Sequence, residues 1–420
     1  MDWVTVAIYM ALLLFGWLNI FAAVYDKDVN DSLFAATFDF GKMPLQMKQF
    51  VFIVTSLIII LTILIVDMRF YETFAYVIFG VLMFILLLIP VIGKEVAGNK
   101  SWLGVGSFGV QPSEFAKFAT ALAIAKFVGS VGFRMDNIRN QVILFVLMGI
   151  PVMLILLQKD FGTALVFSVF LLVFFREGQS PFYLLVGMGV AVIFILTLLV
   201  KNNWILFGAI GGIWLIVIYL NRKRKLRQLI IITLGALVMI ITIQCVELVF
   251  NKLPQHHQKR IMVMLNPDSD PMGYGWNVTQ SKIAIGSGGF AGKGFLNGTQ
   301  TKFDFVPEQS TDFIFCTIGE EHGWIGSLLV VSLFMGLLLR LLFIAERQKS
   351  RFARSYGYSV ACIFFFHFAV NIGMTLGLFP VIGIPLPFFS YGGSSLWAFT
   401  ILLFILLKLD AHRGQVLERL

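Results

Sequence analysis

Residues 70–92 read FYETFAYVIFGVLMFILLLIPVI, an apolar run that contains a single acidic side chain. A helix rises 1.5 Å per residue, so about 20 apolar residues cross the ~30 Å hydrocarbon core of a bilayer. Comparable runs occupy eleven further stretches, which are 4–24, 50–66, 113–131, 142–157, 161–175, 182–200, 204–220, 229–249, 311–339, 358–378 and 394–407. Together they predict an all-α polytopic membrane protein with about 12 transmembrane helices.

The composition supports this class, because 58% of the residues are hydrophobic and only 13% are charged. The net charge of +9 reflects topology rather than nucleic-acid binding. With a cytoplasmic N-terminus, the inner loops, helix ends and tail hold eighteen lysines and arginines, including the cluster at 222–227, whereas the short outer loops hold seven. The positive-inside rule then places both termini in the cytoplasm and the long loop at about 251–310 outside.

The chain contains no internal repeat and no linker, so we expect one integral membrane domain over 1–420. A helical hairpin at about 182–220 is plainly apolar, which indicates packing or lipid contact. The three cysteines lie in or beside apolar runs and indicate neither a disulfide nor a metal site. The first span lacks a basic n-region, which favours a retained helix over a cleaved signal.

Charged side chains enter the membrane in the segment QPSEFAK at 111–117. Pro112 and Ser113 predict a helix start, and Glu114 and Lys117 lie three residues apart on one helix face. An ionisable pair in a membrane helix usually faces the bundle interior and marks a functional path. An interfacial cap with a snorkelling lysine is the structural alternative, and the residues alone leave both open.

The segment QKDFGTA at 158–164 separates two predicted spans. Asp160 is a natural N-cap for the helix that begins at Phe161. Lys159 beside it could bind a phosphate at that helix N-terminus. Taken alone, the pattern fits a structural cap as well as a binding site.

The long outer loop carries two aspartates in the segment NPDSDPMGYGW at 266–276. Asp-Pro-x-Gly is a turn signature, so the default role of either carboxylate is to stabilise the backbone. The functional interpretation is a carboxylate held on a tight turn above the membrane, where it can act as a general base. Asp270 is the candidate, and Asp268 is its competitor.

A glycine-rich segment at 286–294 follows in the same loop and contains Lys293. Its glycines permit close approach of a ligand and expose N–H groups to phosphate oxygens, although a flexible loop explains them equally well. The spacing is not that of a P-loop.

The segment PEQSTD at 307–312 contains Glu308 and leads into a helix that carries Glu320 and Glu321. Glu320 lies about 13 Å along this helix from Thr311, so the two adjacent carboxylates are expected inside the membrane, where a solvated face cannot explain them. The uncharged outer loop at 377–395 contains prolines that fix its shape, as either a re-entrant segment or a rigid turn.

In this order, these segments resemble the SEDS family of cell-wall polymerases, which comprises RodA, FtsW and a sporulation member. The resemblance rests on QPSEFAK, DFGTA, DPMGYGW, IAIGSGGFAGKGFLNGTQ, PEQSTDFIF, IGEE and GIPLPFFSYGGSS. IAIGSGG followed by GTQ is more similar to the RodA branch. The family typically has ten spans, so the hairpin at about 182–220 looks like an inserted pair.

The resemblance implies a peptidoglycan glycosyltransferase of the bacterial cytoplasmic membrane that extends glycan strands from lipid II for cell elongation and rod shape. Its partner would be a class B penicillin-binding protein that cross-links the strands. The family's catalytic aspartate maps onto Asp270, and its important glutamate and lysine map onto Glu114 and Lys117. The other residues expected to contribute to substrate binding are Asp160, Lys293, Glu308, Glu320 and Glu321. No cofactor is required by the sequence, and a divalent cation is compatible but unassigned.

The expected mechanism needs a base and a cationic clamp. Asp270 would take the proton of the attacking 4-hydroxyl, and Lys117, oriented by Glu114, would stabilise the leaving undecaprenyl pyrophosphate. Two alternatives remain open from the sequence, a lipid II flippase and a non-catalytic scaffold for the cross-linking enzyme. The elaborate outer loop and the absence of an inverted repeat favour the polymerase over the transporter.

Overall fold

The computed structural model describes residues 1–25, 40–96, 99–105, 108–200, 203–222, 226–252, 258, 274–303 and 305–414. Its helices are α1 (Trp3–Val24), α2 (Leu45–Ile65), α3 (Met68–Thr73), α4 (Ala75–Ile92), α5 (Pro112–Val128), α6 (Ile138–Leu157), α7 (Phe161–Val166), the 3-10 turn η1 (Phe167–Val169), α8 (Phe170–Arg176), α9 (Pro181–Leu199), α10 (Asn203–Asn221), α11 (Leu226–Lys252), α13 (Tyr274–Ser287), α14 (Ile314–Glu346), α15 (Arg351–Thr375) and α16 (Gly393–Ala411).

Each apolar run that the sequence predicts to span the membrane corresponds to a helix or to the broken helix α7–η1–α8. In the described part of the chain, nine helices are long and apolar enough to cross a membrane. The segments α5, α7–η1–α8 and α9 correspond to the other predicted spans. A chain in lipid must satisfy its backbone hydrogen bonds internally, which helices do. The predicted all-α polytopic architecture is confirmed.

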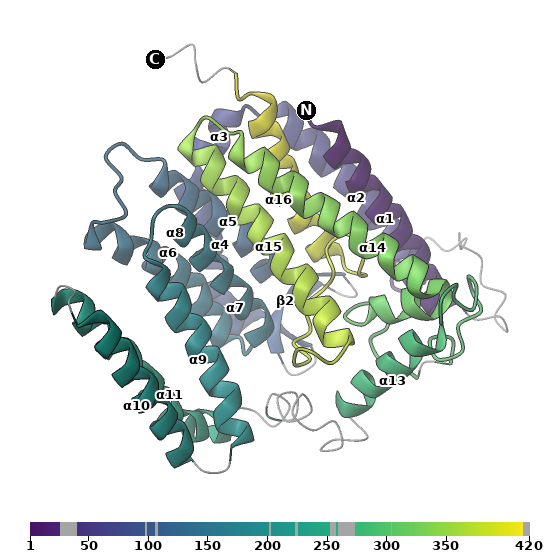
Figure 1. Cartoon of the computed structure of the whole chain (residues 1–420). Helices are drawn as coiled ribbons and strands as arrows, with labels where there is room; N and C mark the ends of the chain where they lie inside the picture. The colour runs from purple at the N-terminus through teal and green to yellow at the C-terminus, as the bar shows by residue number, and fades with distance from the viewer. Residues whose placement is uncertain are drawn as a thin grey trace.

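The helix α5 lies at the centre of the bundle, where it packs against α4, α6, α15 and α16 (Figure 1). Its residues are largely small, and Ala116, Ala119, Ala121 and Ala123 are all fully buried. Small side chains let neighbouring helices approach closely, which is how membrane helices pack when the hydrophobic effect gives little drive. The central helix is therefore surrounded by protein rather than lipid.

The segment between α15 and α16 turns back into the bundle. The carbonyl oxygen of Pro385 lies 3.0 Å from Nδ1 of His367, which is eight residues, or about 12 Å, before the end of α15. Further along, the ring of Phe388 packs edge-on against that of Tyr9 in α1, with centroids 4.8 Å apart. The loop is thus re-entrant and fills the interior of the helical bundle.

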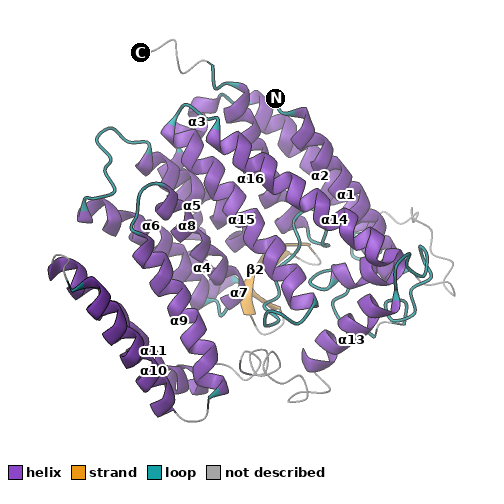
Figure 2. Cartoon of the chain, viewed as in Figure 1, coloured by secondary structure: helices purple, strands orange, loops and turns teal. Residues whose placement is uncertain are grey.

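Two structural features of the loops were not predicted from the sequence (Figure 2). A three-stranded antiparallel sheet of β1 (Lys94–Val96), β2 (Asn99–Val105) and β3 (Phe108–Val110) connects α4 to α5. The helix α13 (Tyr274–Ser287) lies in the outer loop, after the segment that contains Asp268 and Asp270. β1 and β3 are too short to show an alternating pattern, and β2 (NKSWLGV) does not alternate. The helix α13 mixes polar and apolar residues without a membrane-length run.

The predicted hairpin at about 182–220 corresponds to α9 and α10. Both helices pack mainly on α11, and a small apolar cluster of Ile193, Leu206, Ile210 and Ile243 joins the three. Figure 1 shows α10 and α11 at the edge of the molecule, with α9 between them and α8. The pair is therefore part of a three-helix layer at the periphery of the bundle.

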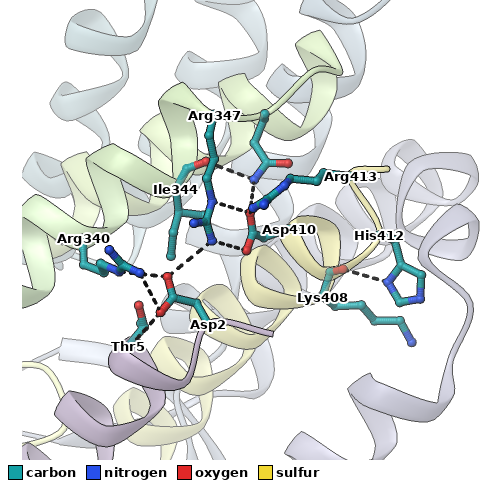
Figure 3. Close-up of polar contacts among 10 residues, drawn as sticks. Asp2, Thr5, Arg340, Ile344, Arg347, Lys408, Asp410, His412 and Arg413 are labelled. Carbon is teal, nitrogen blue, oxygen red and sulfur yellow. Dashed lines mark hydrogen bonds and ion pairs between the residues drawn. The ribbon is translucent and has the colours of Figure 1, made fainter. Parts of the chain in front are cut away.

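The N-terminus and the end of α16 lie at one end of the molecule (Figure 1), where a cluster of ion pairs joins α1, α14 and α16. The buried carboxylate of Asp2 accepts hydrogen bonds from Arg340 at 2.9 Å and from Arg347 at 3.3 Å. Arg347 also pairs with Asp410, which receives a further bond from Arg413 at 3.1 Å (Figure 3). The cluster fixes the start of the chain to two helices that lie more than 300 residues away in sequence.

Asp2→Asn should lower the melting temperature of the detergent-solubilised protein. Asparagine keeps the acceptor that caps α1 but removes the charge that faces two partly exposed arginines, at a cost of about 1–2 kcal/mol. Asp136→Asn is the control, because Asp136 is exposed and its Oδ2 forms only a long ion pair, 3.9 Å from Nη2 of the exposed Arg134. It should leave the melting temperature unchanged. Equal melting temperatures for the wild type and Asp2→Asn would show that the cluster contributes nothing to stability.

Candidate functional site

The ion pair predicted in QPSEFAK lies inside the bundle at the start of α5. Gln111 is the N-cap and Pro112 occupies the first helical position, where its missing N–H leaves no bond unmade. Glu114 and Lys117 then share one face, and Nζ of Lys117 lies 2.8 Å from Oε2 of Glu114. Both residues are buried, so the snorkelling alternative is wrong for Lys117.

A third residue of this cluster, His367 of α15, was not predicted. Its Nε2 lies 3.0 Å from Nζ of Lys117, and its Nδ1 contacts the re-entrant loop at Pro385. The ammonium also lies over the ring of Phe399, 4.7 Å from the centroid. A single histidine in an apolar run gives no local pattern, and the only signal available was its polarity within a predicted span.

Asp160 lies beside this cluster and caps α7, as predicted. Its carboxylate accepts hydrogen bonds from the backbone and hydroxyl of Thr163 at 3.0 and 2.9 Å, and from the side chain of Gln111 at 2.9 Å. The backbone N–H of Gln111 in turn donates to the hydroxyl of Ser394 at 3.0 Å. The starts of α5, α7 and α16 therefore meet at one point.

The PEQSTD segment joins this cluster through the re-entrant loop. Tyr391 N–H donates to the carbonyl of Ser310 at 2.9 Å, and the hydroxyl of Ser390 donates to the carbonyl of Thr311 at 2.6 Å. Asn371 of α15 links the same two segments, because its side-chain amide donates to the backbone carbonyls of Asp312 and Ile384. The end of the outer loop is thus fixed to the loop that contacts His367.

The helix α14 is broken at Gly323, which adopts φ 61° and ψ −152°. In a continuous helix, the N–H groups of Trp324 and Ile325 would donate to the carbonyls of Glu320 and Glu321. The break separates these donors from these acceptors, and all four backbone groups need other partners.

The glycine-rich segment supplies those partners, and it is therefore not a flexible loop. Gly288 and Gly292 approach the break so closely that a Cβ atom at either would collide with a backbone carbonyl of α14. The four replacement bonds are Trp324 N to Gly289 O at 3.0 Å, Ile325 N to Phe290 O at 3.2 Å, Lys293 N to Glu320 O at 3.0 Å and Gly294 N to Glu321 O at 2.9 Å.

The side chain of Glu320 organises the next part of the loop. Its carboxylate is fully buried and accepts hydrogen bonds from Nζ of Lys293 at 2.7 Å and from the backbone N–H groups of Thr299, Gln300 and Thr301 at 2.7–2.9 Å. The hydroxyls of Thr299 and Thr301 donate to it as well. Glu320 thus has partners on both oxygens within the chain.

The remaining predicted residues are Glu321, Glu308 and Asp270. Glu321 is buried, and its Oε2 has no hydrogen-bond partner among the described residues. Glu308 is exposed at a positive φ of 57°, where its carboxylate accepts a bond from the hydroxyl of Thr311 at 2.9 Å. Asp270 and Asp268 lie outside the described residues.

The structure therefore groups the predicted residues into two sites. Glu114, Lys117 and Asp160 meet at the start of α5, whereas Lys293 and Glu320 meet at the break in α14. The first group holds a cation away from water, where a charge acts strongly on its neighbours because screening is weak. Within the part of the chain that the structure describes, no group of three or more histidine, cysteine or acidic residues is placed to hold a metal ion.

Glu320→Gln should destabilise the loop at 288–303. The amide would turn an NH₂ group toward donors that now face a carboxylate oxygen, and losing these charge-assisted bonds should cost roughly 2–4 kcal/mol. We expect a lower melting temperature and faster proteolytic cleavage within 288–303. Glu346→Gln is the matched control, because Glu346 lies on α14 as Glu320 does but forms an exposed ion pair with Arg176 of α8. It should change neither the melting temperature nor the rate of cleavage. Unchanged cleavage in Glu320→Gln would contradict the assigned role.

Comparison with known proteins identifies the family. The family model described as a cell cycle protein, FTSW_RODA_SPOVE, matches residues 3–207 and 179–415. The peptidoglycan glycosyltransferase RodA of Treponema pallidum is 32% identical over 392 residues, covering 87% of this chain and 90% of that protein. The peptidoglycan glycosyltransferase MrdB of Escherichia coli K12 is 31% identical over 379 residues, covering 90% of this chain and 88% of that protein.

Solved structures share the fold. A chain from a peptidoglycan synthase complex, solved to explain how polymerization and crosslinking are coordinated, superposes with a TM-score of 0.70 at 25% identity, covering 99% of this chain and 98% of that chain. The rod shape determining protein RodA of Thermus thermophilus gives a TM-score of 0.63 at 24% identity, with 98% and 97% of the chains covered. The chain belongs to the SEDS family of FtsW, RodA and SpoVE proteins.

Proposed function

We propose that this chain is a peptidoglycan glycosyltransferase of the RodA branch that polymerises lipid II into glycan strands for cell elongation. Two relatives that carry that enzyme name, RodA and MrdB, align over most of their length. The observation that carries the proposal is the buried cluster of Glu114, Lys117 and Asp160, which keeps a cation within the bundle at the starts of three helices. Such a charge can stabilise an anionic leaving group.

In the proposed reaction, the 4-hydroxyl of one lipid-linked sugar attacks the anomeric carbon of a lipid-linked strand. The new glycosidic bond forms as the bond from that carbon to undecaprenyl pyrophosphate breaks, and the proton of the hydroxyl passes to Asp270. Lys117 stabilises the charge that develops on the departing pyrophosphate, while Glu114 holds Lys117 in place. Lys293 and Glu320 order the part of the outer loop at 293–301.

The proposal also includes a partner and a membrane orientation. The partner is a class B penicillin-binding protein, supported by the similarity to a chain of a peptidoglycan synthase complex. The orientation is that of a bacterial cytoplasmic membrane protein with both termini inside and the loop at about 251–310 outside. Its supports are the distribution of cations along the sequence and the position of the N-terminus and the end of α16 at one end of the bundle.

The orientation is tested with an impermeant thiol reagent on intact cells. We expect Lys282→Cys in α13 to be labelled from outside and Gln228→Cys in α11 only after the membrane is permeabilised, because both side chains are exposed. The background should lack the native cysteines at positions 245, 316 and 362. Labelling of both variants from the same side would overturn the topology.

The activity is tested with purified protein, labelled lipid II and the transpeptidase partner. The wild type should produce glycan strands. Translocation of lipid II without polymerisation would favour a flippase. The absence of both activities would favour a scaffold. Asp270→Asn should abolish polymerisation while the protein stays folded, since asparagine keeps the turn-forming acceptor but is not a useful base. The expected loss is about 10²–10⁴-fold, which corresponds to a barrier higher by roughly 3–5 kcal/mol.

Asp268→Asn is the control for this experiment, because it alters the neighbouring carboxylate of the same segment. It should retain most of the activity. An active Asp270→Asn protein, or a folded but inactive Asp268→Asn protein, would show that the general base has been assigned to the wrong residue.

A further inference from the structure

The ammonium of Lys117 is held from three sides by protein groups. It donates to Oε2 of Glu114 at 2.8 Å, lies 3.0 Å from Nε2 of His367, and faces the ring of Phe399 at 4.7 Å. All of these groups are buried, and Lys117 and His367 have no exposed surface. A lysine ammonium has three donors and no acceptor, so each neighbour must offer a lone pair or a π face.

The contacts of His367 determine which of its nitrogens carries the proton. Nδ1 lies 3.0 Å from the carbonyl oxygen of Pro385, which can only accept a hydrogen bond, so Nδ1 must donate. In the neutral ring, Nε2 is then left with its lone pair and accepts from Lys117. A doubly protonated ring would turn an N–H toward the ammonium, so this arrangement requires neutral His367.

We propose that His367 is a positioning residue, which holds the ammonium of Lys117 through Nε2 at the place where the proposed polymerisation needs its charge. A neutral acceptor suits this role, because it orients the cation without cancelling its charge as a second carboxylate would. The ring is itself fixed by Pro385 and by an edge contact with Phe399, with centroids 4.8 Å apart. The inference rests on the proposed function, because it assumes that Lys117 stabilises the leaving pyrophosphate.

The competing explanation is that His367 only anchors the re-entrant loop through Pro385. The two nitrogens allow these roles to be separated, since each faces a different partner. A glutamine amide reaches the position of Nε2, so His367→Gln keeps an acceptor for Lys117 and loses the bond to Pro385. An asparagine amide reaches the position of Nδ1, so His367→Asn keeps a donor for Pro385 and loses the acceptor for Lys117.

The test measures the steady-state rate of glycan synthesis from lipid II, with the transpeptidase partner present. If His367 positions Lys117, His367→Gln should be faster than His367→Asn by on the order of tenfold to hundredfold, the factor expected for one hydrogen bond to a charged group. The difference should lie in kcat rather than KM, because Lys117 acts on the leaving group. His367→Leu, which lacks both polar contacts, should be no faster than His367→Asn.

A matched histidine control lies at the other end of the bundle. Nδ1 of His412 also contacts a backbone carbonyl, that of Lys408 at 3.0 Å, but His412 lies beyond the end of α16, near the ion-pair cluster (Figure 3). His412→Gln and His412→Asn should both retain the wild-type rate. An equal rate for His367→Gln and His367→Asn, or a faster His367→Asn, would overturn the proposal in favour of the loop anchor.

A second measurement separates this inference from the proposed function. Melting temperatures of the same variants are compared with and without the additional substitution Lys117→Met. This comparison does not depend on glycan synthesis by the wild type. Leaving a buried ammonium donor without its acceptor should make His367→Asn less stable than His367→Gln only while Lys117 is present. The same difference in both backgrounds would show that His367 is not coupled to Lys117. A wild type that makes no glycan would instead refute the function.

Discussion

A lysine ammonium buried in a membrane protein must receive its hydrogen bonds from within the fold, because bulk water and lipid headgroups do not reach it. For Lys117, these acceptors come from α5 itself, from α15 and from the aromatic face of α16. His367 can accept through Nε2 only because its Nδ1–H donates to the carbonyl of Pro385 in the re-entrant loop. The path of the chain between α15 and α16 is therefore tied to the charge state of a residue in α5.

The same demand for satisfied polar groups explains the outer loop. The break at Gly323 would leave backbone donors and acceptors exposed to an apolar environment, and the glycine-rich segment satisfies them. The carboxylate of Glu320 then orders the residues that follow. Because the loop takes the place of helical hydrogen bonds, a protein that contacts it would act directly on the backbone of α14.

The spans could be predicted from the sequence, since a bilayer imposes length and composition on each helix separately. The contact between Glu114 and Lys117 could also be predicted, because i, i+3 spacing is a local rule. His367 could not, since its two partners lie 250 and 18 residues away in sequence and no local pattern brings them together. The role of the glycines in 286–294 depended in the same way on a distant break in α14.

The position of α5 has a consequence for how the protein is made. A charged side chain near the centre of a single helix raises its insertion free energy by ~2.5–3.5 kcal/mol, and less toward the helix ends. α5 carries Glu114 and Lys117 on a short helix rich in alanine, whereas α4 and α6 on either side are long and apolar enough to insert by themselves. We infer that α5 enters the bilayer as a dependent segment, which its neighbours must retain near the translocon until α15 arrives. Biogenesis of the core therefore waits for the C-terminal third of the chain.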